Sequence, residues 1–483
     1  MPPCKEDNQR GPSVCLFDDS QLNDSFDKNG TKQLADPKQD EKEDAELDSK
    51  LWWIHGNGYD LQEFVDRHPG GKEAILLGEG RDCTALVESY HAFSPGYNKI
   101  LEKFLVEERN KSPKQDCFYE ILKQRVTDAL RANGLDPQTD RGASWGRFLY
   151  YGLVVLSFLV TGYLHVVKGS ILGSFLFAWA GWFMGAIGHD SGHFATSHNH
   201  PLLNEWGVWA MSFIANPIMW QHQHTYAHHS FTNEHNHDPD LHHFRKYIRV
   251  HNKSKYITEK QRHVWYVMFW YAFTVFGVTL KLPYQMILTG MLHMVKWQDQ
   301  DRLSRKLGVY LHFSLYNAVV IVAPFFAHSS RSVALVSVIL HIATLGWLFS
   351  LMSQISHINE ASLSSDLETK AKGQGSKKRD PRLAASWAAA QVETANNFAP
   401  DSLFWHILSN GLNMQIEHHL FPGLNHCHLH LIAPVVRKTC EEFGVQYKCY
   451  GGWREVWEIH LQWYSKMSHP PAASASASEE ERN

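Results

Sequence analysis

The segment ILGSFLFAWAGWFMGAIGHDSGH occupies residues 171–193 and joins an apolar run to a pair of histidines. The apolar part, Ile171 to Ile187, approaches the roughly 20 residues that a helix needs to cross a bilayer. His189 and His193 follow at once, and residues four apart share one face of a helix. The segment therefore predicts a membrane helix that presents two imidazoles near its end.

Three further apolar runs predict four membrane spans in total, arranged as two helical hairpins. About residues 148–166 pair with 171–187, and 309–327 pair with 333–352, each across a short turn. Arg141 and Arg147 precede the first pair, and two arginines and a lysine at 302–306 precede the second. The turns carry only Lys168 and Arg331. The positive-inside rule then places the long flanks in the cytosol. We expect an all-α integral membrane domain over residues 148–465, with a cytosolic helical cap.

Two other apolar stretches are harder to place. Residues 264–292 are long enough to span a membrane, but Lys281 and Pro283 interrupt them. A single crossing there would put the polar regions before and after it on opposite faces, so we interpret the stretch as an interfacial or re-entrant helix, with a span as the alternative. Trp206 to Trp220 is too short to span and is predicted to lie at the interface.

The remaining segments are polar. Residues 1–50 predict a disordered leader, and they contain no apolar signal segment, so we expect the N-terminus to be cytosolic. Residues 107–147 predict a helical linker, Ser362 to Arg382 a mobile loop, and residues 466–483 a disordered tail that leaves the C-terminus cytosolic. The net charge of −4 gives no basic field for nucleic acid. The seven scattered cysteines include no CxxC pair, which argues against a disulfide framework and a thiolate zinc site.

A pair of histidines in residues 51–106 has the pattern of a haem site. His68-Pro69-Gly70-Gly71 is followed by His91 in a segment whose short apolar runs predict a small α+β domain. A haem held by two imidazoles needs one from each side of the ring, and a glycine turn lets the backbone pass close to the porphyrin. Such a haem transfers electrons and does not bind oxygen.

Three histidine clusters lie on the predicted cytosolic flanks of the hairpins. They are HDSGH at 189–193, HTYAHH at 224–229 and QIEHH at 415–419. Helical spacing pairs His189 with His193, His224 with His228, and Gln415 with His419. Imidazole suits iron, copper and zinc, and the chain carries its own electron-transfer domain, so redox-active iron fits better than zinc. Metal-bound imidazoles need acceptors on their other nitrogen, and the candidates are Asp190, Asn233, Asp238 and Asn413.

Other histidines and tryptophans carry weaker signals. We interpret His198, His200, His222, His235, His237, His242 and His243 as surface or structural residues. Five tryptophans near the first two clusters are candidates for lining an acyl tunnel, namely Trp179, Trp182, Trp206, Trp209 and Trp220.

The order of these motifs resembles that of a front-end fatty acid desaturase with an N-terminal fused cytochrome-b5-like domain. The resemblance covers about residues 51–465, and its most specific stretch is QIEHHLFP, Gln415 to Pro422. It implies protohaem on His68 and His91, two non-haem iron ions, O2 as co-substrate and electrons from NADH-cytochrome b5 reductase. It also implies residence in the endoplasmic reticulum membrane. The iron ligands that it implies are His189, His193, His224, His228, His229, His357, His418 and His419, with Gln415 as a further, weaker one.

The same resemblance implies a cis double bond placed between an existing one and the carboxyl end of a polyunsaturated acyl chain. The six-residue second cluster favours the Δ5 or Δ4 position over Δ6 and Δ8. The acyl carrier, phospholipid or coenzyme A, stays open. So do a sphingolipid long-chain-base desaturase, a hydroxylase on the same iron scaffold, and a membrane-tethered haem electron carrier without desaturase activity.

Overall fold

The computed structural model describes residues 47–470, apart from residues 95, 112–115, 244–246, 258–260, 262–263, 293–294, 297–302, 364–382 and 384–385. The predicted leader and tail lie almost wholly outside the described residues, and so does most of the predicted loop from Ser362 to Arg382. The first two residues of that loop end the short helix α16, Glu360–Leu363.

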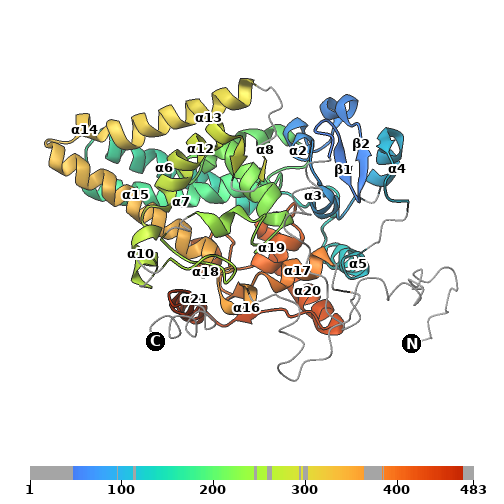
Figure 1. The fold of residues 1–483 in the computed structure, drawn as a ribbon. Coiled ribbons are helices and arrows are strands. Elements are labelled where there is room, and N and C mark those ends of the chain that lie inside the picture. Colours follow the sequence, from blue (N-terminus) through green and yellow to red (C-terminus); the bar gives the residue numbers. More distant parts are fainter. Residues whose placement is uncertain are drawn as a thin grey trace, which may run out of the picture. The chain divides into compact units, whose positions relative to one another are not determined.

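The first described domain is the small α+β unit that the sequence predicts (Figure 1). Its sheet has the order β1-β2-β3, and all neighbours are antiparallel. His55 and Gly56, both with positive φ, form the tight turn between the first two strands. Tryptophan and aliphatic side chains, Trp52 and Leu77 among them, fill its core. The elements are β1 Trp52–Ile54, β2 Asn57–Tyr59, η2 Gln62–Arg67, α2 Lys72–Leu76, α3 Thr84–Tyr90, α4 Tyr97–Leu101, η3 Glu102–Phe104 and β3 Leu105–Glu107.

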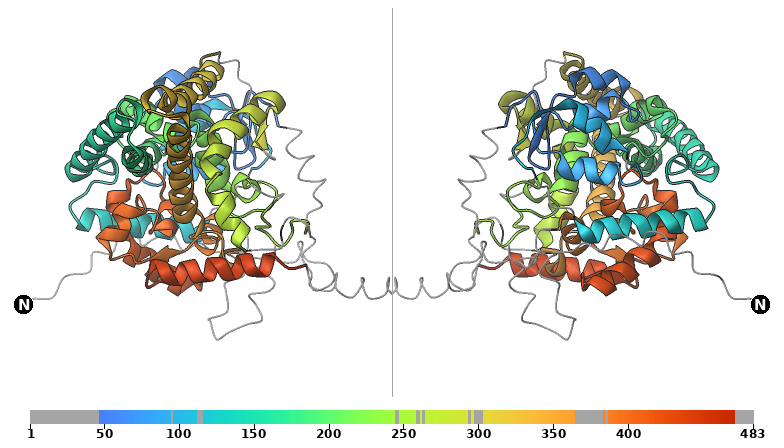
Figure 2. Two further views of the ribbon diagram at one scale, coloured as in Figure 1. Left: turned by 90° about the vertical axis from the view of Figure 1, so that its left-hand side faces the viewer. Right: turned by 90° about the vertical axis from the view of Figure 1, so that its right-hand side faces the viewer.

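The segment 107–147, predicted as a helical linker, contains the helix α5, Cys117–Ala132. Its Asp116 side chain caps the helix by accepting from the Tyr119 amide. One face of α5 is buried against α17, Trp387–Glu393, and α20, Leu429–Phe443 (Figure 2). This helix of the predicted linker is therefore part of a packed core.

Among the described residues, four helices are long and apolar enough to cross a membrane, with up to five if a bent pair forms one span. They are α6 Trp145–Val166, α7 Ile171–Gly192, the continuous stretch Lys306–Ala327 and α15 Arg331–Gln354. The third comprises α13 Leu303–Tyr316, the π-helical η8 Asn317–Val322 and α14 Pro324–Ala327. Leucines such as Leu149 and Leu159 of α6 are more than 60% exposed, as expected of a surface that faces lipid.

The first two long helices run antiparallel. Arg147, near the start of α6, donates a hydrogen bond of 2.8 Å to Asp190, near the end of α7. At the opposite end, an added Cβ at Gly169 would lie 2.7 Å from the carbonyl oxygen of Ala327. The turn after α6 therefore meets the end of α14, and the glycine is required for this close approach.

Residues 265–289 form a bent pair of helical segments. Trp265–Tyr271 and Thr274–Thr289 meet at 52°. At the bend, an added Cβ on Gly346 of α15 would lie 2.6 Å from the carbonyl oxygens of Tyr271 and Ala272. The bend thus packs directly against α15. The elements are α10 Trp265–Tyr271, α11 Thr274–Phe276, η7 Gly277–Lys281 and α12 Leu282–Thr289, followed by β4 Met291–Leu292 and β5 Val295–Lys296.

The stretch from Trp206 to Trp220 packs against α7. Met211 and Ile214 are buried there, and their partners include Trp182 of α7. Gly188 of α7 lies against the Met211 backbone, where a Cβ would clash. This stretch consists of the last residues of α8 Pro201–Gly207, then η4 Val208–Phe213 and α9 Pro217–Trp220.

The rest of the chain forms a helical layer next to the ends of α7 and α15 (Figure 1). Its core is formed mainly by α5, α17, α19 and α20. Two short parallel strands, β6 and β7, tie α17 to the C-terminal helix. Its further elements are η5 Gln221–His228, η6 Pro239–His242, β6 Asn397–Phe398, α18 Leu403–Leu408, α19 Gln415–Leu420, η11 His426–His428, β7 Cys449–Tyr450 and α21 Trp453–Met467.

Candidate haem and metal sites

His68 and His91 face each other in the small domain. Their ring centroids lie 6.0 Å apart. Nδ1 of His68 lies 3.0 Å from the Gly71 carbonyl oxygen, and Nδ1 of His91 lies 2.9 Å from that of Val87. Burial lowers the pKa of both rings, to about 4 for His91. Each neutral ring therefore donates from Nδ1 and keeps the Nε2 lone pair, which is the arrangement that an axial haem ligand needs.

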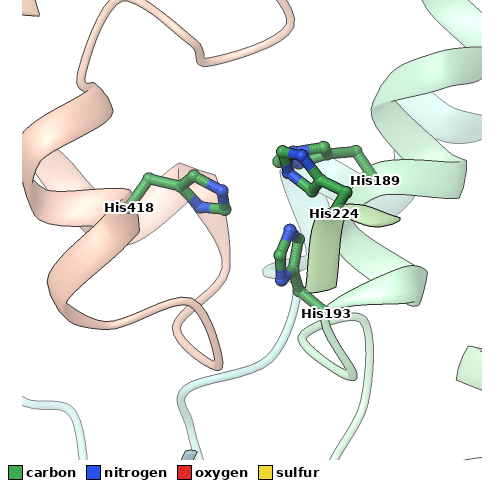
Figure 3. Close-up of side chains that lie close together, drawn as sticks. All are labelled: His189, His193, His224 and His418. Carbon is green, nitrogen blue, oxygen red and sulfur yellow. Dashed lines mark hydrogen bonds between the residues drawn. The ribbon is translucent and has the colours of Figure 1, made fainter. Parts of the chain in front are cut away.

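Four predicted metal ligands converge at the end of α7. His189 and His193 come from α7 and its C-cap, His224 from η5, and His418 from α19 on the opposite side (Figure 3). One ring nitrogen from each lies within 4.8 Å of the others. Nε2 of His189 is 3.1 Å from Nε2 of His224. Two nitrogens bound to one ion at about 2.1 Å lie roughly 3.0–3.4 Å apart. We call these four residues the first group.

Three further ligand candidates form a second group beside the first. Nitrogens of His228, His357 and His419 lie within 4.8 Å of one another. His357 follows α15 directly, as the sequence predicts. The ring centroids of His228 and His419 are 5.0 Å apart, and those of His224 and His228, one from each group, are 5.1 Å apart. The two groups are therefore adjacent.

The second histidine cluster does not form the α-helix that we predicted. Residues Gln221–His228 are π-helical. Because a π-helix bonds residue i to i+5, His229 shares a face with His224, and their Nε2 atoms lie 3.3 Å apart. The His229 ring also stacks on His419, with centroids 4.2 Å apart. His229 thus stands between the two groups.

Gln415 lies in the second group, one helical turn before His419. Its amide nitrogen lies 2.9 Å from Nε2 of His357 and 3.2 Å from Nε2 of His419. Its buried amide oxygen has no hydrogen-bond partner among the described residues. The amide therefore reaches the space that the two imidazoles enclose.

The donor set fits metal ions. Burial lowers the pKa of His193, His229 and His418 well below the ordinary value, so these rings are neutral and can offer lone pairs. Buried ring nitrogens of the same three residues have no hydrogen-bond partner in the described part of the chain. A buried imidazole nitrogen without a partner is costly, and a bound metal ion removes this cost.

Comparisons with known proteins agree with this arrangement. Residues 162–451 match the family model of fatty acid desaturases, and residues 38–108 match that of the cytochrome b5-like haem/steroid binding domain. An acyl-lipid (8-3)-desaturase of Physcomitrium patens is 30% identical over 86% of this chain and 87% of its own length. The chain belongs to the fatty acid desaturase family. It is an oxidoreductase with a fused cytochrome b5-like domain.

Other relatives have similar coverage. An acyl-lipid (8-3)-desaturase of Mortierella alpina is 29% identical over 85% of this desaturase and 92% of its own length. Delta(5) fatty acid desaturase A of Dictyostelium discoideum is 29% identical over 86% and 90%. No solved structure matches the chain. The apolar helices and the family together make this desaturase a membrane protein.

Of the four predicted acceptors in the desaturase, Asp238 contacts a ligand candidate as expected. It accepts from Nδ1 of His228 at 3.0 Å. Burial lowers the pKa of His228, but Asp238 and Asp240 outweigh that effect and raise it to about 9. Asn233 instead donates to backbone carbonyls, including that of His357. Asn413 contacts His406, which is not a ligand candidate.

Asp190 and His426 form a buried pair, of which only Asp190 was predicted from the sequence. Asp190 accepts from Nδ1 of His426, from Arg147 and from the Tyr151 hydroxyl. The His426 ring lies 4.9 Å from His189 and 4.6 Å from His418. Sequence reasoning missed His426, because it follows the third cluster by seven residues and returns to the first group through a chain reversal. Gln391, whose amide oxygen lies 2.8 Å from Nδ1 of His419, was also missed.

A cavity in the desaturase reaches both groups from the membrane helices. Its wall includes His189, His224, His228 and His357 as well as apolar side chains, namely Trp182, Met211, Ile214, Val278, Phe349 and Leu412. Of the five tryptophans suggested for a tunnel, only Trp182 and Trp220 line this cavity. Trp206 is 77% exposed, as suits a residue at the edge of a membrane.

Proposed function

We propose that this desaturase introduces a cis double bond between an existing double bond and the carboxyl end of a polyunsaturated acyl chain. The observation that carries the proposal is the pair of adjacent imidazole groups in the wall of a cavity that apolar side chains also line. With two iron ions bound there, O2 would supply the oxidising power to remove hydrogen from two neighbouring methylenes. A zinc centre would have no use for the electrons of a haem.

The position of each ligand candidate determines which of the two iron ions it would hold. The first group comprises His189, His193, His224 and His418, the second comprises His228, His357 and His419, and His229 stands between them. Gln415 would bind weakly or orient His357 and His419. The apolar wall would hold the acyl chain and keep water away, which favours oxidation over side reactions.

We propose protohaem on His68 and His91 as the immediate electron source, reduced by NADH-cytochrome b5 reductase. The small domain lies against the second histidine cluster. Arg81 lies over the Tyr226 ring at 4.3 Å, and the Tyr226 hydroxyl donates to the Asp82 carbonyl at 2.9 Å. These contacts would keep the haem beside the iron site throughout the reaction.

We also propose that the four long helices form two hairpins in the endoplasmic reticulum membrane, with both ends of the chain and all histidine clusters cytosolic. His193 and His357 follow the ends of α7 and α15, whereas Gly169 and Ala327 meet at the other end. A glycosylation acceptor on an extended loop inserted after the exposed Ser329, in the turn before α15, is expected to be modified. The same acceptor inserted in the tail is expected to stay unmodified.

For the double-bond position we propose Δ5 or Δ4. A relative named Delta(5) fatty acid desaturase supports Δ5. The test is expression in a host without polyunsaturated lipids, with single acids supplied and the new bond located by mass spectrometry. A new bond on the carboxyl side of an existing one is expected. A product found only in sphingoid bases would support the long-chain-base alternative, and a hydroxylated product would support a hydroxylase.

A further inference from the structure

Tyr90 joins the haem domain to the first histidine group. It is the last residue of α3 and directly precedes the haem ligand candidate His91. Its hydroxyl oxygen lies 2.5 Å from Nδ1 of His193, and the two rings are nearly parallel, at 13° with centroids 6.3 Å apart. The residue that precedes the haem ligand candidate His91 in the chain therefore contacts the iron ligand candidate His193.

The geometry fixes the direction of this hydrogen bond. Nε2 of His193 has no hydrogen-bond partner among the described residues and belongs to the first group. With Nε2 turned to the metal, Nδ1 carries the proton and donates it to the Tyr90 oxygen. Tyr90 thus occupies the position in which metal-bound imidazoles usually have a carboxylate or a carbonyl.

The surroundings of Tyr90 hold it in place. The Phe194 ring meets its edge with centroids 5.9 Å apart. On another side, Gly423, which follows the third cluster, lies against the Tyr90 ring, where an added Cβ would be in ordinary van der Waals contact at 3.4 Å. The contacts of Arg81 and Asp82 with Tyr226 fix the same domain a few residues earlier. The bridge is therefore packed between two parts of the desaturase domain.

The second group has no comparable connection. The outer nitrogens of its rings contact Asp238, the Thr394 carbonyl and Gln391, all within the desaturase domain. Among the ligand candidates in the described chain, His193 is the one whose outer nitrogen contacts the haem domain. With haem and iron bound, a path through Tyr90 would therefore enter the first group.

We propose that Tyr90 is the positioning residue that couples the haem electronically to the first histidine group, through His193. This proposal rests on the proposed function. In each transfer, one electron leaves ferrous haem, which becomes ferric, and reduces one ferric iron at the first group to ferrous, and no atom moves. Two such electrons, two protons and O2, with two hydrogens from the acyl chain, yield two water molecules and the double bond.

The experiment uses the full-length, iron-loaded enzyme with its haem reduced, and follows haem reoxidation by stopped-flow absorbance after mixing with O2 and acyl substrate. Tyr90→Phe removes the hydroxyl and keeps the ring. With Tyr90→Phe loaded to the wild-type iron content, we expect haem reoxidation to slow by about 10-fold or more, with unchanged haem content and haem potential. Tyr59→Phe, a change in the core of the same domain, is the matched control and should reoxidise at the wild-type rate.

A second measurement separates electron transfer from structure. When excess dithionite supplies electrons directly, Tyr90→Phe should form product in a single turnover as wild type does. Wild-type haem reoxidation in iron-loaded Tyr90→Phe would overturn the proposal. Failure of the iron-loaded variant with dithionite would also overturn it, because Tyr90 would then be a structural support of His193. If wild type itself binds no iron, the proposed function fails first, and that outcome is recognised before any variant is compared.

Discussion

Asp238 accepts a hydrogen bond of 3.0 Å from Nδ1 of His228, and both side chains are buried. The carboxylate orients the ring so that Nε2 faces the second group. Asp238→Asn removes the negative charge, and we expect iron affinity at this group to fall by about 10–100-fold. Iron titration monitored by metal analysis measures the change. Glu234→Gln, at a side chain that is 54% exposed, is the matched control, and equal affinities in both variants would contradict the assignment.

The two groups should lose metal separately. His418 belongs to the first group and His419 to the second. We therefore expect His418→Ala and His419→Ala each to lower the iron-to-haem ratio from about two towards about one and to abolish product. The haem spectrum should stay unchanged in both, since neither residue contacts the haem domain core. Full activity in either variant would remove that residue from the ligand set.

Loss of a haem ligand should leave the iron groups loaded. His68→Ala removes one of the two facing imidazoles, and we expect the low-spin haem spectrum and NADH-driven product formation to disappear. Iron content should remain that of wild type. The control is His200→Ala, at a histidine outside both groups. A retained low-spin spectrum in His68→Ala would show that another residue binds the haem.

The buried face of α5 should contribute strongly to stability. Leu122 is fully buried among side chains of α5, α17 and α20, whereas its neighbour Ile121 is 39% exposed. We expect Leu122→Ala to cost about 2–5 kcal/mol because it leaves a cavity. Ile121→Ala should change stability by about 0.5 kcal/mol or less. Thermal unfolding of the detergent-solubilised proteins compares the two, and similar melting temperatures would contradict the packing.

Acid should weaken the contact between the haem domain and α5. Burial raises the pKa of Glu88, but hydrogen bonds and charge from His55, Lys123 and Tyr97 outweigh it and hold the pKa at about 2. Glu120, the other acidic group nearby, is itself paired with Lys123.

The folded-state pKa of Glu88 lies below the ordinary value. Its stabilising effect is therefore complete above about pH 4.5 and declines as the pH falls from there towards 2. We expect the melting temperature of wild type to fall over this interval more steeply than that of Glu88→Gln, and equal slopes would contradict this.

Much of the architecture could be predicted, because it depends on local patterns. Apolar runs of about 20 residues predicted the four long helices, although α7 continues beyond Ile187 to carry His189 within the helix. The third cluster formed the predicted helix, in which Gln415 and His419 share a face. The pair His68 and His91 meets as a haem would require.

The rest depends on contacts between distant segments. Spacing predicted that His228 would lie beside His224, and their ring centroids are 5.1 Å apart. The π geometry at residues 221–228 also brings His229 to His224, and spacing did not predict this contact. Tyr226 of the same segment packs into the haem domain, an interaction that no local pattern encodes. Tyr90 and His193 are 103 residues apart, and their contact exists only after both domains have docked.

Tyr226 and Ala227 complete the apolar core of the haem domain together with Trp52, Leu61 and Val65. A haem domain expressed alone, without the desaturase domain, would therefore expose an apolar surface where these two side chains had packed. The fusion thus does more than raise the local concentration of the haem domain near the desaturase domain, because the two domains share an apolar core. A separate electron-carrier protein would lack these two side chains in its core and could not directly replace the fused domain. If the two domains were encoded as separate chains, each would expose apolar residues at this contact.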